Sequence, residues 1–390
     1  MPGTSPRTRL IFQNSNLFVS PIGTSGNGAT GAFGSGAVWG SPLGVAAASP
    51  FITELSRIQS IDLTVGIPRQ DINIFGRLNR IDAEVLTPPT VGLNFSYFVT
   101  DGFNEYKMGF AAKGGGSFVS GFITNVTNDK NYFISYSPQG LDDDGFTNIN
   151  QRDVIGIGNA SVTNYSLNAA VAQPVTATVT LDGFNVAFYT GSSGKQSPAV
   201  FPVNSAPVTG WFFNLPTATA QTSAPNGEIS ILKPGDITVS LPTDAGFGSA
   251  VSGIYAANIQ SFTLAVPINR QRTQKLGSPF GISNEIQFPV NCTLSIQALQ
   301  TDLIANSLDQ LLCNDSVKNI SINIKQPGCA GANTPDAVNM TFNGAFLTNY
   351  AVSQTIGGDA TLTLDYTAQL AGATSTDGFT FSGAYTGIFN

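Results

Sequence analysis

Residues 58–93 read IQSIDLTVGIPRQDINIFGRLNRIDAEVLTPPTVGL, and residues 259–294 repeat this stretch as IQSFTLAVPINRQRTQKLGSPFGISNEIQFPVNCTL. Aligned without a gap at an offset of 201, the two segments are identical at 13 of 36 positions. One register held over this length indicates a tandem duplication, which has to be recognised before any local structure is assigned.

Two shorter blocks extend the repeat toward the end of each copy. GNASVTNYS around Asn164 matches NGAFLTNYA around Asn349 at an offset of 185, and ATVTLD (residues 177–182) matches ATLTLD (residues 360–365) at 183. The blocks keep their order, so each copy is expected to be one domain with its own core. We expect a glycine-rich N-terminal arm and the first strand of domain 1 over 1–50, domain 1 over 51–190, a linker over 191–227, and domain 2 over 228–390.

The composition favours strands and turns over helices. Only 11% of the 390 residues are charged, whereas Gly (42) and Phe (27) are abundant. Alternation of apolar and polar residues predicts strands over 58–67 and 131–136, and a long hairpin that turns across 171–174. One helical turn is expected within 103–118. Helical spacing of apolar residues predicts an amphipathic helix over 301–317.

The residue types argue against an enzyme and against a cofactor. The chain has no histidine, which removes the commonest general base and metal ligand. We therefore expect no catalytic, cofactor-binding or metal-ligating residues. The run Asp142-Asp143-Asp144-Gly145 lacks the spaced ligands of a calcium loop and is expected to be a solvated turn.

Charge and hydropathy limit the partners. The chain has a net charge of −7, so the chain as a whole is not expected to be attracted to nucleic acid. The N-terminal residues are not expected to act as a signal peptide, and no apolar run is long enough to predict membrane insertion. Three cysteines are expected to be free thiols, as in a reducing cytoplasm.

A few charged and amide side chains recur in both long copies of the repeat. We treat them as candidate assembly contacts, made in the same way by each copy; the alternative is a salt bridge or loop hydrogen bond inside each domain. They are Arg69, Gln70 and Glu84 in the first copy, and Arg270, Gln271 and Glu285 in the second.

The ordered set of blocks resembles the tail tube proteins of long-tailed bacteriophages. The resemblance rests on IQS-x-x-L-x-V, the following RQ and FG (Phe75-Gly76), the VGLNFSY segment, and VTNYS with ATVTL; NGAFLTNY and ATLTLDY repeat it in the second copy. It covers most of residues 51–190 and 251–390. Two features depart from it: members often have one domain, and the glycine-rich arm has no counterpart.

The resemblance implies a mainly β fold with two tandem tail-tube-type β-sandwich/barrel domains, each with about one flanking helix. It further implies a virion tail protein, made in the host cytoplasm, that self-associates into rings. Six tube domains close such a ring, so three chains of two domains suffice. Rings stack into a hollow tube that meets other tail proteins at its ends and conducts double-stranded DNA without binding it. The alternatives are another virion component (baseplate, neck or decoration protein) or the inner tube of a related injection device; a carbohydrate-binding β-protein and a carboxylate-based glycosidase are further possibilities.

Overall fold

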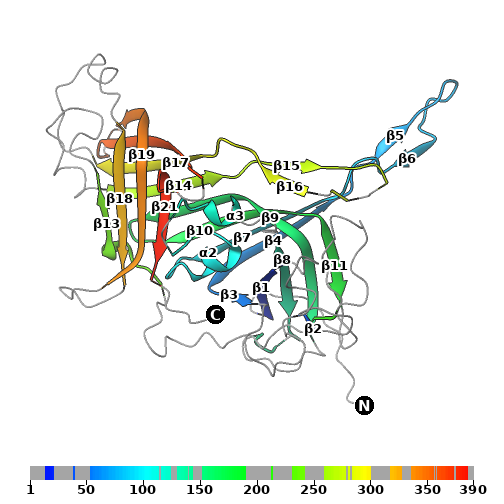
Figure 1. Cartoon of the computed structure of the whole chain (residues 1–390), viewed down its shortest axis with the longest axis horizontal. Coiled ribbons are helices and arrows are strands. Elements are labelled where there is room, and N and C mark those ends of the chain that lie inside the picture. Colours follow the sequence, from blue (N-terminus) through cyan, green and yellow to red (C-terminus); the bar gives the residue numbers. More distant parts are fainter. Residues whose placement is uncertain are drawn as a thin grey trace.

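Strands β7, β9 and β10 form the centre of the N-terminal half of the chain, in a computed structural model of all 390 residues. The structure describes residues 14–21, 38–39, 53–113, 116–123, 130–138, 140–143, 152–189, 212–213, 231–241, 259–277, 280–281, 283–299, 317–326, 335–354, 356, 358–372 and 375–384. Described strands far outnumber helices, as the composition predicts (Figure 1).

We call the elements from β1 to β11 the N-half. Their bounds are β1 (Ser15–Pro21), β2 (Val38–Trp39), β3 (Thr53–Leu55), β4 (Ile58–Gly66), β5 (Gln70–Ile72), β6 (Asp82–Glu84), β7 (Thr90–Phe98), α2 (Phe103–Met108), α3 (Ser120–Ile123), β8 (Lys130–Tyr136), β9 (Asp153–Ala170), β10 (Thr176–Gly183) and β11 (Asn185–Tyr189).

The elements from β13 onward form the C-half, and β12 (Phe212–Phe213) lies between the halves in sequence and pairs with β2. The C-half contains the 3-10 turn η3 (Pro234–Asp236) and strands β13 (Ile237–Ser240), β14 (Ile259–Pro267), β15 (Arg270–Thr273), β16 (Ser283–Ile286), β17 (Asn291–Leu299), β18 (Lys318–Lys325), β19 (Asp336–Ser353), β20 (Thr361–Gln369) and β21 (Gly378–Gly383).

Strand β9 is shared by two layers of strands. Its first part pairs with β8 and β11, whereas its second part, from Ser161 on, pairs with β10. The side chains of these two layers meet in one core, as the 6.3 Å between the ring centroids of Phe95 on β7 and Tyr132 on β8 shows. A strand of 18 residues can serve both layers because it exceeds the usual strand length.

The C-half repeats this plan, with β14 to β21 following the order of β4 to β11. Strand β19 pairs with β18 and β21 in its first part and with β20 in its second. A β-bulge falls at Thr163 in β9 and at Thr348 in β19. Each threonine hydroxyl donates to a carbonyl of the neighbouring strand, Thr163 to Thr180 at 3.1 Å and Thr348 to Asp365 at 3.0 Å. The bulge therefore fixes which residues of the two halves are equivalent.

This register corrects one expectation from the sequence. The block pairing of residues 177–182 with 360–365 at an offset of 183 is wrong, because β10 and β20 both correspond at 185. Thr180 is thus equivalent to Asp365, and Asp182 to Thr367. Alternating Thr and Leu residues let the sequence match two residues out of place, since a slip by two keeps every side chain on the same face.

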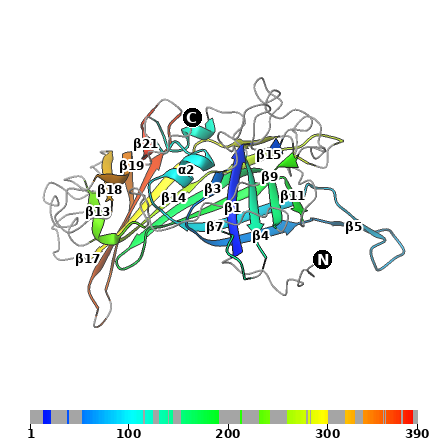
Figure 2. The ribbon, with the colours of Figure 1, turned by 90° about the horizontal axis from the view of Figure 1, so that it is seen from below.

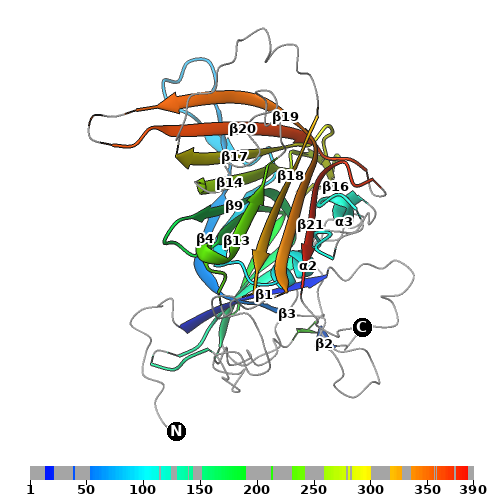
Figure 3. The same cartoon turned by 90° about the vertical axis from the view of Figure 1, so that its left-hand side faces the viewer.

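The two halves share one continuous sheet. Its order from one edge is β4-β7-β10-β9-β14-β17-β20-β19, with β18 and β13 beyond β19. Figure 3 shows β20, β17, β14 and β9 following one another in this sheet. We call the contact between β9 and β14, together with the residues beside it, the inner joint.

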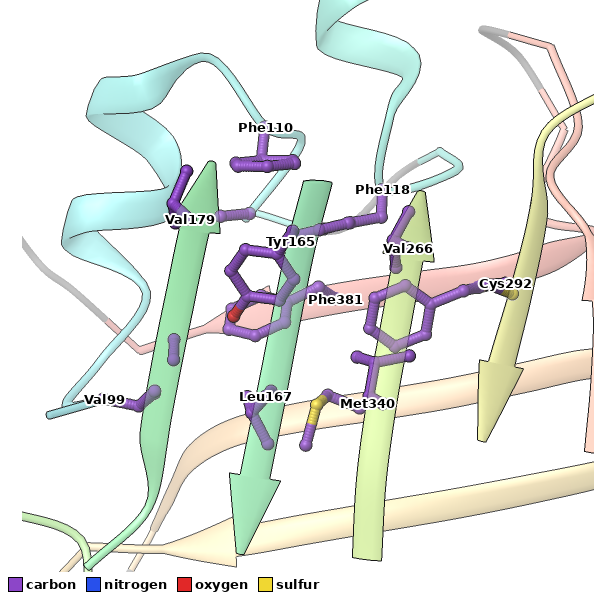
Figure 4. Close-up of a cluster of buried hydrophobic side chains, with 14 of the residues drawn as sticks. Val99, Phe110, Phe118, Tyr165, Leu167, Val179, Val266, Cys292, Met340 and Phe381 are labelled. Carbon is purple, nitrogen blue, oxygen red and sulfur yellow. The ribbon is translucent and has the colours of Figure 1, made fainter. Parts of the chain in front are cut away.

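One face of the sheet is buried under an apolar core that crosses the inner joint. Figure 4 shows Tyr165 and Leu167 of β9 and Val266 of β14 in one layer with Phe110, Phe118 and Phe381. The ring centroids of Phe118 lie 5.1 Å from Tyr165 and 5.5 Å from Phe381 on β21. The segment around α2 and α3 therefore packs against both halves.

The structure confirms several sequence predictions. Strands cover 58–66 and 130–136, β9 and β10 form the long hairpin, and α2 supplies the helical turn within 103–118. The N-half has two short helices where about one was expected. The helix expected over 301–317, most of the arm and most of the linker lie outside the described residues.

The expected solvated turn at 142–145 is wrong for Asp143, which is 1% exposed. Its carboxylate lies 3.1 Å from Nε of the fully buried Arg152 and accepts a 2.5 Å hydrogen bond from Ser135 Oγ. A buried carboxylate requires such partners, and the arginine comes from nine residues further along the chain. The run of aspartates at 142–144 does not by itself indicate this pairing.

Candidate assembly interface

The inner joint is built first of backbone hydrogen bonds. Strand β14 runs antiparallel to the second part of β9, from Ser261 opposite Ala170 to Pro267 opposite Asn164. The ladder continues past the strand, because Ile268 N donates to the carbonyl of Thr163 at 2.8 Å. The carbonyl of Thr163, at the bulge, thus accepts a hydrogen bond from the C-half.

The core side of β14 is closed by the joint. Phe262 is 2% exposed and Leu264, Val266 and Ile268 are all fully buried. On β9, Tyr165 and Leu167 are also fully buried. Apolar burial of this extent is the main stabilising contribution to the joint.

Arg270 extends the joint beyond the sheet. Its Nε donates to the carbonyl of Val162 on β9 at 2.8 Å, and its Nη1 donates to the carbonyl of Asn284 at 3.0 Å. Its guanidinium also lies 5.7 Å from the ring centroid of Phe122 on α3. The equivalent Arg69 is exposed, and its Nη1 makes the equivalent hydrogen bond to Ala83 at 3.3 Å. Each arginine therefore bonds within its own hairpin, and Arg270 additionally bonds to the other half.

The four other candidate contacts lie in the same hairpins. Gln70 faces Glu84 in the β5–β6 pair, and Gln271 faces Glu285 in the β15–β16 pair. All four are exposed, and Gln271 Oε1 accepts a 3.4 Å hydrogen bond from the Gln287 amide. The structure thus brings the three residues of each copy together within one hairpin. Of the six, within the described part of the chain, Arg270 is the one that forms a hydrogen bond across the inner joint.

Arg272 forms an ion pair across the joint, and the sequence analysis did not identify this residue. Its Nη2 lies 2.8 Å from both carboxylate oxygens of Asp182 on β10. The same guanidinium donates to the carbonyls of Pro89 and Gly183 at 3.1 Å and lies 4.5 Å from the ring centroid of Phe184. The signal available in the sequence was that the repeat carries an acid, Asp71, at the matching position.

The two hairpins lie in different surroundings. In Figure 1 the β15–β16 hairpin lies over the N-half, whereas β5 and β6 project away from the body of the chain. Figure 2 shows the same projection of β5 from a second direction. The projecting hairpin exposes Phe75 and Leu78 fully, at 107% and 111%. It is therefore a surface that the described part of this chain does not cover.

The strands at the two ends of the eight-strand run repeat the strands of the inner joint. In the described residues, β4 pairs only with β7, and the last part of β19 (residues 349–353) pairs only with β20. By the offsets of 201 and 185, β4 is equivalent to β14, and this part of β19 is equivalent to the joint part of β9. We call these two edges the free N edge and the free C edge.

Equivalent apolar residues are buried at the inner joint and exposed at the free edges. Val65 is 44% exposed and Ile67 57% exposed, where Val266 and Ile268 are fully buried. On the other edge, Val352 is 44% exposed, where the equivalent Leu167 is fully buried. Both edges therefore present the apolar pattern of a joint without its partner.

The second face of the sheet is open and almost uniform. The eight strands that follow one another in the sheet, β4-β7-β10-β9-β14-β17-β20-β19, contain no lysine and no arginine. The residues on the open face of the central strands carry small hydroxyl and amide groups that bond across strands, such as Ser60 to Ser96 at 2.7 Å and Thr263 to Asn168 at 3.4 Å. The charged residues on this face are acids: Asp62, Asp182 and Asp365.

A buried carboxyl group lies beneath the joint. Glu105 on α2 is 1% exposed and accepts hydrogen bonds from the hydroxyls of Tyr97 at 2.7 Å and Tyr165 at 3.1 Å. Burial raises the pKa of Glu105, although the two tyrosine hydrogen bonds oppose the shift. Burial and the neighbouring Glu105 raise the pKa of both tyrosines. This group ties α2 to β7 and β9.

Other kinds of site receive no support from the described residues. They contain no group of three or more His, Cys, Asp or Glu side chains that could hold a metal ion. Within that same part of the chain, no helix is both long and apolar enough to cross a membrane. Cys292 is a buried free thiol, and burial raises its pKa to about 12.

No family model matches the chain, and no curated protein matches it. A chain in a cryo-EM structure of the anti-feeding prophage (AFP) baseplate, 6-fold symmetrised, is similar to 42% of this chain over 98% of its own length, with 13% identity and a TM-score of 0.25. A chain in the tail of an empty GTA particle, with C6 symmetry, is similar to 39% of this chain over 98% of its own length, with 16% identity and a TM-score of 0.23. Both TM-scores are low, so the proposal for this chain rests on its own edges and side chains.

Proposed function

We propose that the chain is a non-enzymatic structural subunit of a phage tail that assembles with copies of itself, edge to edge. The observation that carries the proposal is the pair of free edges: β4 repeats β14, and β19 repeats β9, yet among the described strands only β14 and β9 are joined to each other. The free N edge of one chain then pairs with the free C edge of the next. We call this contact the outer joint.

The inner joint sets the register of the outer joint. Opposite residues Val266 and Tyr165 translate to Val65 and Tyr350, and Ala265 and Ser166 translate to Thr64 and Ala351. Ile67 N takes the place of Ile268 N and donates to the carbonyl of Thr348 in the next chain. Arg69 Nε takes the place of Arg270 Nε and donates to the carbonyl of Leu347. The apolar residues of both edges then become buried together.

Such a contact is heterologous and must close into a ring or continue as a filament. We infer closure with three chains, because the resemblance to tail tube proteins implies six tube domains per ring and each chain supplies two. The ring has true threefold and approximate sixfold symmetry. A closed ring leaves neither end of the eight-strand run exposed to aggregation.

In the ring the open face lines the lumen. The opposite face carries α2, α3 and the second layer of strands, and the bulkier side of a closed sheet lies outside because more room is available there. The strands of this lining carry hydroxyls, amides and aspartates, and the arginine beside them, Arg272, is paired with Asp182, so the lining gives passing double-stranded DNA no unpaired cation to bind. Repulsion from the two other aspartates, Asp62 and Asp365, acts within about 8 Å at physiological salt. Rings stacked in the virion tail then conduct the genome and meet other tail proteins at the tube ends.

Disulfide trapping tests the outer joint. Thr64→Cys and Ala351→Cys are combined in the full-length chain, because both positions are exposed and opposite each other in the proposed register. We expect covalent dimers and trimers on oxidation, with the series ending at trimers. The matched control is Thr64→Cys with Val352→Cys, whose side chains point to opposite faces, and it should trap far less. No trapped species for the first pair, or a series that continues well beyond trimers, would contradict the proposal.

A further inference from the structure

One pair of facing positions differs in charge between the inner joint and the proposed outer joint. At the inner joint, Arg272 of the β15–β16 hairpin binds Asp182 of β10, and the two side chains are only 15% and 34% exposed. The equivalent positions at the outer joint hold Asp71 on the β5–β6 hairpin and Thr367 on β20. At the outer joint the carboxylate is therefore on the hairpin, at Asp71, and the facing residue, Thr367, is uncharged.

A second exchange accompanies the first. A Cβ atom at Gly281 would lie 2.8 Å from Cγ of Arg272, so positions 281 and 272 are side by side in the β15–β16 hairpin. The residue equivalent to Gly281 is Arg80, whose Nη1 lies 2.8 Å from Oδ1 of Asp71. The β5–β6 hairpin thus carries an ion pair of its own where the β15–β16 hairpin carries a single cation.

Resting on the proposed function, we infer that these residues select which edge each hairpin joins. Two combinations leave no charge unmatched: Arg272 with Asp182, and the Asp71–Arg80 pair with Thr367. Each of the two other combinations leaves one charge without a partner. The β5–β6 hairpin placed on an N-half brings Asp182 beside an already paired Asp71, and the β15–β16 hairpin placed on a C-half leaves Arg272 facing Thr367. An unmatched charge in a partly buried joint opposes the contact.

The consequence is alternation of N-halves and C-halves around the ring. Without it, the free N edge of one chain would compete for the β9 edge of another, because the two joints share their backbone register and apolar pattern. Matching by charge removes that competition at positions outside the β9–β14 ladder and outside the equivalent ladder proposed for the outer joint. The partner selected is therefore the C-half of a second copy of this chain.

The test introduces the mismatch at the outer joint of the full-length protein. Thr367→Asp places a second carboxylate opposite Asp71, and we expect the protein concentration needed for assembly to rise by about tenfold or more. The control is Thr367→Asn, because asparagine has nearly the shape of aspartate but no charge. This variant should assemble as the unmodified chain does. Raising the salt concentration should restore part of the assembly of Thr367→Asp only, because the repulsion is screened.

A rescue variant transfers the inner joint to the outer one. Asp71→Arg and Arg80→Gly, added to Thr367→Asp, reproduce the Arg272, Gly281 and Asp182 arrangement and should restore assembly. Monomer folding is checked for each variant by its urea unfolding midpoint. Assembly of Thr367→Asp at the unmodified concentration, or equal defects in Thr367→Asp and Thr367→Asn, would overturn the inference. Failure of the unmodified chain to assemble would instead overturn the proposed function.

Discussion

Val266 and Val65 hold equivalent positions in two copies of one strand, yet Val266 is fully buried and Val65 is 44% exposed. The difference arises because β14 has a neighbour in β9, whereas β4 has a described neighbour on one side only. The exposed valine is the residue that a second chain is expected to cover.

Replacing each valine by aspartate should separate assembly from folding. Val65→Asp adds a charge at a partly exposed edge, so we expect a stability loss of about 1 kcal/mol or less and a loss of ring formation. Val266→Asp buries a charge in the core and should cost about 3 kcal/mol or more. Urea unfolding and sedimentation velocity measure the two effects. Leu141→Asp, at an exposed turn, is the control and should change neither; rings formed by Val65→Asp would count against the outer joint.

The two repeated arginines should differ in the same way. Arg270→Glu removes the hydrogen bonds to Val162 and Asn284 and is expected to lower the free energy of unfolding by about 2 kcal/mol. Arg69→Glu leaves the chain folded and impairs ring formation, since its Nε is proposed to bond to the next chain. Urea unfolding and particle counts by electron microscopy are measured for both variants. Equal loss of chain stability in both variants would show that Arg69 acts within its own chain.

The buried carboxyl group predicts a pH dependence of stability. Because burial raises the pKa of Glu105 above its ordinary value of 4.5, the folded chain holds this proton more tightly than the unfolded chain. Its contribution is therefore complete below about pH 4.5 and is lost as the pH rises through the raised pKa. Glu105→Gln keeps an acceptor for Tyr97 and Tyr165 and cannot ionise.

The free energy of unfolding is measured in urea for the unmodified chain and for Glu105→Gln, at a series of pH values from 4.5 upward. The stability of the unmodified chain relative to Glu105→Gln should fall as the pH rises from 4.5. A difference that stays constant with pH would mean that Glu105 has the same pKa in the folded and the unfolded chain, so that burial does not raise it.

The buried pair of Arg152 and Asp143 should behave as one unit. Arg152→Met leaves a buried carboxylate without its cation and is expected to cost about 3–5 kcal/mol. Adding Asp143→Leu removes the unmatched charge, so the double variant should lose less than the sum of the two single losses. Urea unfolding of the four proteins gives the coupling, and additive losses would contradict the pairing.

Much of the architecture could be predicted from the sequence because repetition and alternation are local signals. The repeat of residues 58–93 at 259–294 placed β4 and β14 in equivalent positions, and apolar alternation located the β9–β10 hairpin. The direct pairing of β9 with β14 could not be predicted this way, because no local pattern records which strand lies beyond an edge.

The charged residues show the same limit. Arg69 and Arg270 are identical in the two copies, whereas the counterpart of Arg272 is Asp71. Residues that distinguish the two joints are those in which the copies differ, so a comparison by identity excludes them. Asp182 was also assigned the wrong counterpart, Asp365, because the Thr-Leu alternation matches equally well two residues out of register.

The central claim is that the free N edge of one chain pairs with the free C edge of the next and that three chains close the ring. Cryo-electron microscopy of particles assembled from the full-length chain tests it most directly, with symmetry determined rather than imposed. We expect threefold rings in which Thr64 of one chain lies opposite Ala351 of the next, in a sheet that continues around the lumen. A ring of six full-length chains, or rings in which β4 has no strand partner on its outer side, would contradict it.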